Sequence, residues 1–311
     1  MNNAYEESVS ALHRGNRDHE LASLVVLLRS KALPLERLAA VVEQFGSVYT
    51  LQRVARESQL APKFDPEDIE NALITVQKWR EERRDVRTVF DPTYPRNLLN
   101  VFNKPPLLFI SGNWREDRDG LSISVVGTRK PSPDGVKRAQ QAARKFAKAR
   151  ITVISGLAAG IDTAVHTAAL DAGGRTVAVM GTGIDRIYPP QNLALAEQIV
   201  TEGGALISQF FPDQPPMQWS FPMRNVVMSG LSLATLVIEA SDTSGARQQA
   251  RHALQHGRTV FLAASLVQSH AWARKMVEIG YDGAQALVAE SVDEVVDRLT
   301  GTCDAPAVAA G

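Results

Sequence analysis

The chain has 311 residues, with 34 basic and 34 acidic side chains and therefore no formal net charge. This length predicts about two domains, and a content of 44% hydrophobic and 22% charged residues is typical of a globular rather than a disordered protein. One cysteine, Cys303, excludes a disulfide framework and a cysteine-rich zinc site. Because no apolar run approaches about 18 residues and residues 1–12 lack the core of a secretion signal, we expect a cytoplasmic protein without membrane contact.

The first part of the chain has the apolar spacing of helices. The sequence predicts helices over residues 19–29 and 34–45, with Gly46 ending the second. A third begins at Asp65, where a proline and two acids follow a capping side chain. The charged stretch over residues 80–85 marks the boundary. We therefore expect a small helical N-terminal domain over residues 1–85.

Short apolar, β-branched runs then alternate with helix-period stretches. This alternation predicts an α/β domain over residues 86–300, built on a doubly wound, mainly parallel sheet. Residues 301–311, rich in alanine and glycine, are expected to form a disordered tail. The expected strands are Ile123–Gly127, Ile151–Gly156, Thr176–Gly181, Ala205–Phe210, Leu233–Ala240, Thr259–Ala263 and residues 284–288; the expected helices are 133–149, 162–172, 193–202, 222–230, 244–256, 269–279 and 291–299.

Three of these strands end in glycine, at Gly127, Gly156 and Gly181. The carboxyl ends of parallel strands form the edge where such folds bind ligands, and each loop leads into a helix whose free N–H groups attract anions. One such glycine is as readily explained by the turn of the chain. Three in one sheet favour a ligand that bears phosphate, and Ser132 with Pro133 opens the first of the helices.

The motifs of several enzyme classes are absent. The segment 181–186 has two glycines of a dinucleotide fingerprint but not the third, and no Walker, nucleophile-elbow or zinc-protease motif occurs. His166 has no metal-ligand spacing to another histidine. Asp162 and Glu239 are the most catalytic-looking carboxylates, but Asp162 is also explained as a helix-start acid that supports its own loop. No nucleophile–base pair emerges, so we expect a protein that is not an enzyme and needs no cofactor or metal.

Two further segments suit nucleic acid, although each has a simpler explanation. Residues 126–150 contain eight basic side chains and one acid, Asp134, a pattern that is also typical of a solvated helix face. Residues 210–225 place four aromatic side chains among prolines, which is also typical of a core cap. Single-stranded nucleic acid binds to cations through its backbone and to aromatic faces through its bases.

The sequence resembles the DNA-processing protein A (DprA, also Smf) family from about Asp91 to Leu299. The matching motifs are Asp91-Pro-Thr-Tyr94-Pro95, Pro105-Pro106-Leu-Leu-Phe109, Gly112-Asn113, Val126-Gly127-Thr128-Arg129, Ser155-Gly156-Leu157-Ala158-Ala159-Gly160-Ile161-Asp162, Gly181-Thr182-Gly183, Tyr188-Pro189-Pro190-Gln191-Asn192, Phe221-Pro222-Met223-Arg224-Asn225, Leu231-Ser232, Val237-Ile238-Glu239-Ala240 and Ser244-Gly245.

This resemblance implies an extended Rossmann-like fold for residues 86–300 and a SAM-like helical domain before it. It also implies a homodimer that binds single-stranded DNA, protects incoming strands and loads the RecA recombinase in natural transformation. It implies that Arg129 and Lys130 hold phosphates and that Phe221 stacks a base, with Arg224 and Asn225 in the same pocket. A backbone cradle is implied at Ser155, Gly156, Gly181 and Gly183. The complete expected DNA-binding set is Gly127, Arg129, Lys130, Ser155, Gly156, Gly160, Asp162, Gly181, Gly183, Phe221, Arg224, Asn225, Ser244 and Gly245.

The chain departs from the pattern of the family at several pocket positions. Gln209 replaces the usual acid after Ser208, and Val226 replaces the usual arginine after Asn225. The stretches 244–248 and 263–265 also differ from the usual sequence. An alternative ligand is therefore a free nucleotide or a nucleotide-derived signal, which would make the protein a sensor of the same Rossmann-like superfamily.

Overall fold

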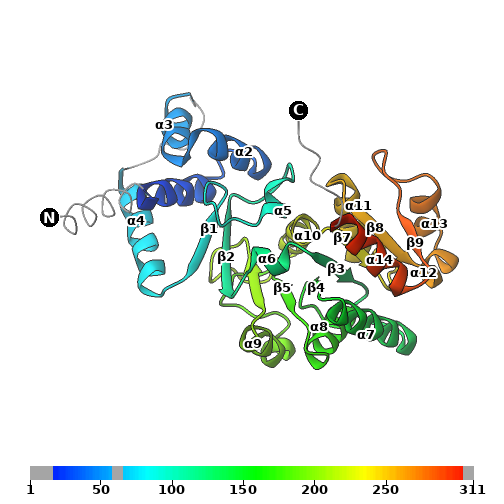
Figure 1. Cartoon of the computed structure of the whole chain (residues 1–311). Helices are drawn as coiled ribbons and strands as arrows, with labels where there is room; N and C mark the ends of the chain where they lie inside the picture. Colours follow the sequence, from blue (N-terminus) through cyan, green and yellow to red (C-terminus); the bar gives the residue numbers. More distant parts are fainter. Residues whose placement is uncertain (1–16, 58–65, 304–311) are drawn as a thin grey trace. The chain divides into compact units, whose positions relative to one another are not determined.

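The computed structural model describes residues 17–57 and 66–303, which divide into two compact units (Figure 1). The first unit comprises the chain up to Tyr94 together with Pro105–Leu107, and the second comprises Pro95–Lys104 and the chain from Leu108 onward. The first unit thus extends past the charged stretch at residues 80–85, where the sequence places the boundary.

The first unit is mainly helical, as expected. Residues 17–30 are helical, and α2 (Leu35–Phe45), α3 (Ser47–Glu57), α4 (Pro66–Glu81) and the short strand β1 (Asp85–Thr88) follow. The sequence did not predict α3. Its first turn is capped from a distance, because the carboxylate of Glu20 accepts hydrogen bonds from the backbone N–H groups of Ser47 and Val48. No local pattern near residue 47 reveals such a cap.

The second unit contains the predicted doubly wound sheet. Its strands lie in the order β2-β6-β5-β4-β3-β7-β8-β9, and every neighbouring pair is parallel except β2 and β6. The strands are β2 (Leu107–Gly112), β3 (Ser122–Val126), β4 (Thr152–Ser155), β5 (Thr176–Val179), β6 (Ala205–Ser208), β7 (Ala234–Val237), β8 (Thr259–Ala263) and β9 (Leu287–Ala289).

Helices cover both faces of this sheet (Figure 1). On one face, α7 (Pro133–Lys148), α8 (Ile161–Asp171) and α14 (Val292–Cys303) share a core with β3, β4, β7 and β8, and α9 (Leu193–Thr201) packs against β5 and β6. On the other face, the Ser124 hydroxyl of β3 donates to Met228 O of α10 (Ser220–Leu231), which packs on α11 (Gly245–Gln255). Burial on both faces explains why these strands are mainly apolar, with small buried Ser and Thr side chains such as Ser124 between the apolar ones.

The structure confirms the predicted fold class and changes several elements. The antiparallel edge strand β2 was not predicted, and the short helices α5 (Arg96–Leu99) and α6 (Glu116–Asp119) flank it. The helix expected over 269–279 is α13 (Ala271–Glu278), and the short helix α12 (Ala264–Ser269) before it was not predicted. Residues 301–303 belong to α14 rather than to a disordered tail, and residues 304–311 lie outside the described part.

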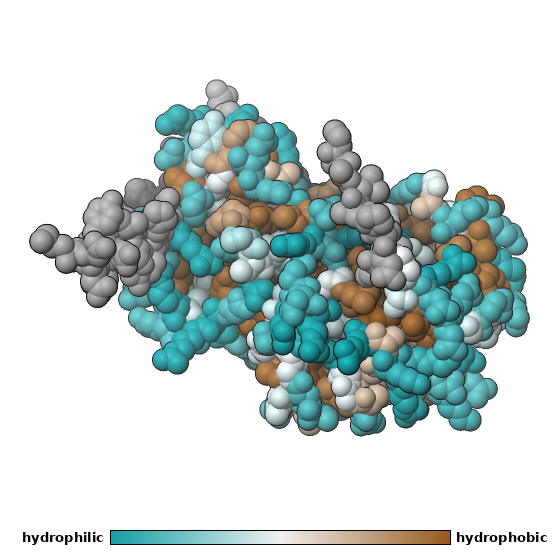
Figure 2. All heavy atoms as spheres, in the orientation of Figure 1, coloured by the Kyte–Doolittle hydropathy of each residue, from teal (hydrophilic) through white to brown (hydrophobic). Residues whose placement is uncertain are grey.

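The face of the molecule in Figure 2 shows mainly hydrophilic side chains over the outer surface of α7. Among the residues that the structure describes, no helix has the length and apolar character needed to span a bilayer.

Candidate functional site

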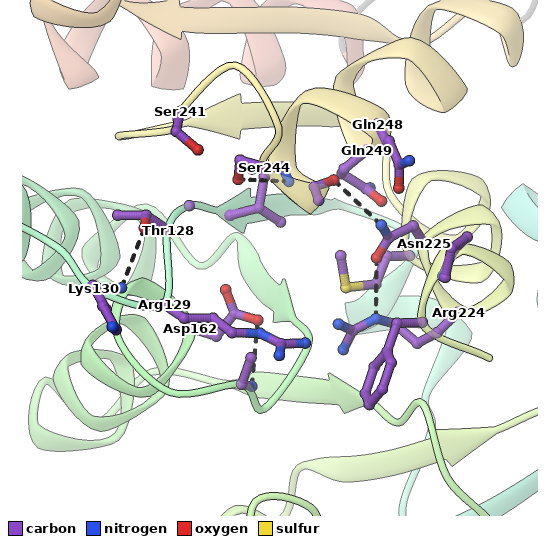
Figure 3. A pocket seen from close by; sticks show the side chains of 18 residues that line it. Thr128, Arg129, Lys130, Asp162, Arg224, Asn225, Ser241, Ser244, Gln248 and Gln249 are labelled. Carbon is purple, nitrogen blue, oxygen red and sulfur yellow. Dashed lines mark hydrogen bonds between the residues drawn. The ribbon is translucent and has the colours of Figure 1, made fainter. Parts of the chain in front are cut away.

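A cavity of about 360 Å³ opens at the carboxyl ends of β3, β4 and β7 (Figure 3). The chain winds from β3 toward β4 on one side and continues through β7 on the other, so the cavity occupies the point where the strand order reverses, the usual ligand position in such sheets. Its lining residues are Val126, Gly127, Thr128, Arg129, Lys130, Ala158, Asp162, Phe221, Pro222, Arg224, Asn225, Met228, Ser241, Ser244, Gly245, Ala246, Gln248 and Gln249.

The loop after β3 is held in place by backbone hydrogen bonds. Thr128 N–H donates to Glu239 O at 2.7 Å, and Ile161 N–H donates to Thr128 O at 3.2 Å. Gly160 permits this approach because it has a φ of +84°, and a Cβ there would lie 2.5 Å from Thr128 O. The backbone of Arg129 is thereby fixed between two strand ends.

The helix N-termini beside the cavity already carry carboxylates of this chain. Glu239 accepts from Ser132 Oγ at 2.7 Å and from Ser132 N at 3.1 Å, directly before the first turn of α7. Asp162 accepts from Gly156 N at 3.1 Å and from Ala158 N at 3.4 Å, at the start of α8. Carboxylates of this chain therefore bind the N-cap residue of α7 and the loop before α8, while the expectation that an anionic ligand lies at these helix starts stays a prediction.

Arg224 forms the buried floor of the cavity. It is 6% exposed, and its guanidinium donates to Val179 O at 2.8 Å, to Gly156 O and to the Asn225 side chain at 3.1 Å. Burial lowers the pKa of Arg224, and the nearby Asp162 carboxylate opposes that shift. Burial likewise raises the pKa of Asp162, and Arg224 opposes it. The two charges compensate each other inside the protein.

The ring of Phe221 lies at one side of the cavity. Gly181 packs closely against this ring: a Cβ at this position would lie 2.6 Å from Phe221 Cδ1. The Arg129 guanidinium lies over the ring with its carbon 5.2 Å from the centroid, and the Tyr188 ring is tilted against it at 5.7 Å between centroids. A base that stacks on Phe221 must therefore displace or join the Arg129 guanidinium.

The structure brings together most of the expected site residues. The nine that line the cavity are Gly127, Arg129, Lys130, Asp162, Phe221, Arg224, Asn225, Ser244 and Gly245. The five that do not are Ser155, Gly156, Gly160, Gly181 and Gly183.

At four of these five positions, groups of the protein itself pack close by. The Ser155 hydroxyl is buried and donates to Val125 O at 2.7 Å. On the side where a Cβ would lie, Gly156 meets the Arg224 guanidinium, Gly181 meets the Phe221 ring, and Gly183 meets the backbone of Phe211 and Pro212. Gly160 supports the neighbouring loop, and the expected backbone cradle for phosphates stays a prediction.

Sequence reasoning predicted Gly245 of α11 but missed the other lining residues of this helix, Ala246, Gln248 and Gln249. The Ser244 hydroxyl caps this helix by accepting from Ala246 N at 3.2 Å, so Gln248 and Gln249 lie one turn into it and reach the cavity. The signal was present, because a serine before a helical stretch predicts its start, and the side chains four and five residues later lie one turn into that helix.

The other suggestive segments lie apart from the cavity. Of the four aromatic residues in 210–225, only Phe221 lines it, whereas Phe210 is buried and packs edge-on against Trp219. On α7, Lys145 pairs with Asp293 of α14 at 2.6 Å, and the helix runs away from the strand ends. Within the described residues, no three His, Cys, Asp or Glu side chains gather closely enough to hold a metal ion.

Comparisons with known proteins match the part of the chain that contains the sheet and the cavity. The profile of the family described as DNA recombination-mediator protein A matches residues 85–300. Protein Smf of Escherichia coli is 36% identical over 223 residues, which are 72% of this chain and 57% of that protein. Protein Smf of Synechocystis is 39% identical over 61% of this chain and 48% of that protein. The chain thus spans about half the length of these curated relatives.

Solved structures agree with this assignment. The crystal structure of DNA processing protein A from Streptococcus pneumoniae superposes with a TM-score of 0.63 at 27% identity, covering 89% of this chain and 92% of that one. The protein of the same name from Helicobacter pylori, whose structure concerns a single-stranded DNA binding mode, has a TM-score of 0.60 at 23% identity and covers 70% of this chain and 97% of that one. On the matched 216-residue span and these relatives, the chain belongs to the DNA recombination-mediator protein A family.

Proposed function

We propose that this protein binds single-stranded DNA and mediates recombination by protecting the strand and loading the RecA recombinase onto it, in natural transformation or a related DNA transaction. Membership of the family supports this, as does the single-stranded DNA binding mode described for the Helicobacter pylori relative. The proposal includes a homodimer that acts in the cytoplasm and catalyses no reaction itself.

The observation that carries the proposal is the division of the cavity into a neutralised interior and a cationic rim. Inside, Asp162 accepts from the loop before α8, Glu239 accepts from the N-cap residue of α7, and Arg224 is bound to backbone carbonyls. At the rim, Arg129 and Lys130 are exposed, and the Arg129 guanidinium lies over the ring of Phe221. Phosphate is therefore met at the surface and a base beside it, which is the arrangement that a passing strand requires.

The same division disfavours the nucleotide sensor. A free nucleotide gains much of its affinity from phosphates placed on helix N-termini, and here the Glu239 carboxylate binds the N-cap residue of α7 while the Asp162 carboxylate binds the loop before α8. Catalysis is disfavoured as well, because the carboxylates of Asp162 and Glu239 both accept hydrogen bonds from the backbone. The protein offers binding groups at this site, without a paired nucleophile and base.

Fluorescence anisotropy tests the proposal directly. Labelled oligo-dT of about 15 nucleotides, within the usual range of site sizes, should bind well ahead of a blunt duplex of the same length. A free nucleotide in excess should not displace the oligonucleotide. Equal binding to strand and duplex would indicate a nonspecific basic surface and contradict the pocket, and tight binding of the nucleotide alone would favour the sensor. Recombinase loading is measured as faster RecA filament assembly on oligonucleotide that already carries this protein.

A further inference from the structure

A second, smaller cavity of about 170 Å³ lies between α11 and α13. Its wall contains three cations and two aromatic rings, and none of its residues lines the first cavity. The lining residues are Arg247, Arg251, Trp272, Lys275, Met276, Gly280 and Tyr281. The function proposed above does not use this cavity.

The two arginines of this cavity are held flat against rings. The guanidinium carbon of Arg247 lies 5.6 Å from the centroid of Trp272, and that of Arg251 lies 5.1 Å from the centroid of Tyr281. Arg247 and Arg251 are four residues apart on α11, so they stand on the same side of the helix. A ring that supports a guanidinium leaves its N–H edge free to face a phosphate in a bidentate manner.

The cations of this cavity form no ion pair within the described residues, and three of the N–H donors around it have no acceptor there. In the described part of the chain, no carboxylate forms an ion pair with Arg247, Arg251 or Lys275, and Arg247 has one hydrogen bond, to Asp242 O at 2.9 Å. The Nε–H groups of both arginines and the Nε1–H of Trp272, a side chain only 7% exposed, are buried donors without an acceptor among those same residues. Native proteins leave few such groups unsatisfied. Unlike the first cavity, this one is not neutralised by the protein, so it is suited to an anion from outside.

The position of this cavity indicates which anion. Helix α11 separates the two cavities, with Gln248 and Gln249 facing the first and Arg247 and Arg251 facing the second. A helix with its side chains is about 10–12 Å wide. Even a stacked strand advances about 3.4 Å per nucleotide, so about three or four nucleotides cross that width.

We propose that the cavity between α11 and α13 is a second phosphate-binding contact for the same DNA strand, reached after the strand leaves the first cavity and crosses the start of α11. This inference rests on the proposed single-stranded DNA binding and adds to it the path that the strand takes over the surface. Arg251 and Lys275 bind phosphate, and the rings of Trp272 and Tyr281 position the arginines.

The test compares oligonucleotides of two lengths and two double variants. Arg251→Gln with Lys275→Gln removes two cations from the second cavity. Arg144→Gln with Lys148→Gln is the matched control, because it removes two exposed cations from the part of α7 that leads away from the strand ends. Melting curves establish that both variants fold. Anisotropy is measured with dT oligonucleotides of about 3 and about 15 nucleotides, at about 50 and about 200 mM salt.

The expected effect is specific to length and to salt. Two lost contacts to a single strand lower the magnitude of the slope of log affinity against log salt by about 1.4. Between about 50 and about 200 mM salt, the variant therefore loses about 7-fold less affinity than the wild type does. The 15-mer should show this with the cavity variant, while the 3-mer and the control variant should behave as the wild type does.

Other results separate the possible failures. If the wild type does not bind the 15-mer at all, the proposed function itself is wrong. If it binds, and the cavity variant retains wild-type affinity and slope, the strand does not visit α13 and this inference is wrong. An equal loss in the control variant would also overturn it, since the effect would then be general charge. If a short acidic peptide binds to the second cavity and an oligonucleotide does not compete with it, the cavity belongs to a protein partner and this inference is wrong.

Discussion

Replacement of Arg224 by methionine tests whether the cavity floor is a compensated charge pair. The substitution keeps the apolar stem but removes the donors to Gly156 O and Val179 O and the charge that faces Asp162. A buried carbonyl that loses its partner costs about 1–3 kcal/mol, and isolating a buried charge adds to this. We expect the free energy of unfolding to fall by about 3 kcal/mol, which in a domain of this size lowers Tm by roughly 6–12 °C.

The pH dependence of this loss identifies its cause. Because burial raises the folded-state pKa of Asp162, its contribution favours folding below the unfolded pKa and is lost as pH rises through the folded pKa. Arg224 limits that loss by lowering the pKa of Asp162, so the variant should lose more stability than the wild type as pH rises. The difference in Tm should therefore be smaller near pH 4.5 than near pH 7.

Thermal melts followed by circular dichroism at both pH values measure this difference, and Asp162→Asn provides the control. When Asp162→Asn is combined with Arg224→Met, the pH dependence of the Arg224 effect should disappear, because the titrating group is gone. A Tm difference that stays constant across this pH range in the single variant would refute the argument. In that case packing alone, rather than charge compensation, keeps Arg224 in place.

Four shorter predictions concern other groups. Phe221→Ala should weaken oligo-dT binding by about 1–3 kcal/mol in anisotropy with little change in the salt slope, and a changed slope would show that the ring acts through the neighbouring cation. Arg129→Ala should lower that slope by about 0.7, and an unchanged slope would place the phosphate elsewhere. Gly181→Ala should weaken oligo-dT binding in anisotropy and change Tm little, because the new Cβ displaces the Phe221 ring; an unaltered affinity contradicts this. His166 has a pKa lowered by burial to about 3, so stability should fall as pH drops below about 6.5, and His166→Asn should flatten this decline in acid melts.

The fold was predictable because its signal is local and repeated. Strands buried on both faces are mainly apolar, and the helices between them carry one apolar side, so the alternation is visible without any contact information. The antiparallel strand β2 was missed because its apolar residues follow Pro105-Pro106 and no helix separates it from a parallel partner. Helix α3 was missed because its cap comes from Glu20, on another helix.

The site was predictable only in part, because a glycine at a strand end indicates a close approach but not the approaching group. At Gly156 the neighbour is Arg224, 68 positions later, and at Gly181 it is Phe221. Both residues belong to one turn of α10, and only the folded chain brings that turn against two strand ends. Nine of the fourteen expected residues therefore line one cavity, while the phosphate cradle assigned to the glycines stays a prediction.

The protein's own groups at the glycine loops also explain why charge matters differently at the two cavities. In the first cavity, Arg224 donates to backbone carbonyls, Asp162 accepts from the loop before α8, and Glu239 accepts from Ser132. The binding energy for a phosphate therefore comes from the exposed Arg129 and Lys130, where salt screens it. In the second, Arg251 and Lys275 have no such internal anion in the described chain. A strand that contacts both cavities would therefore bind with a salt dependence that neither cavity produces alone, and its affinity would rise with length up to the span of α11 and then level off.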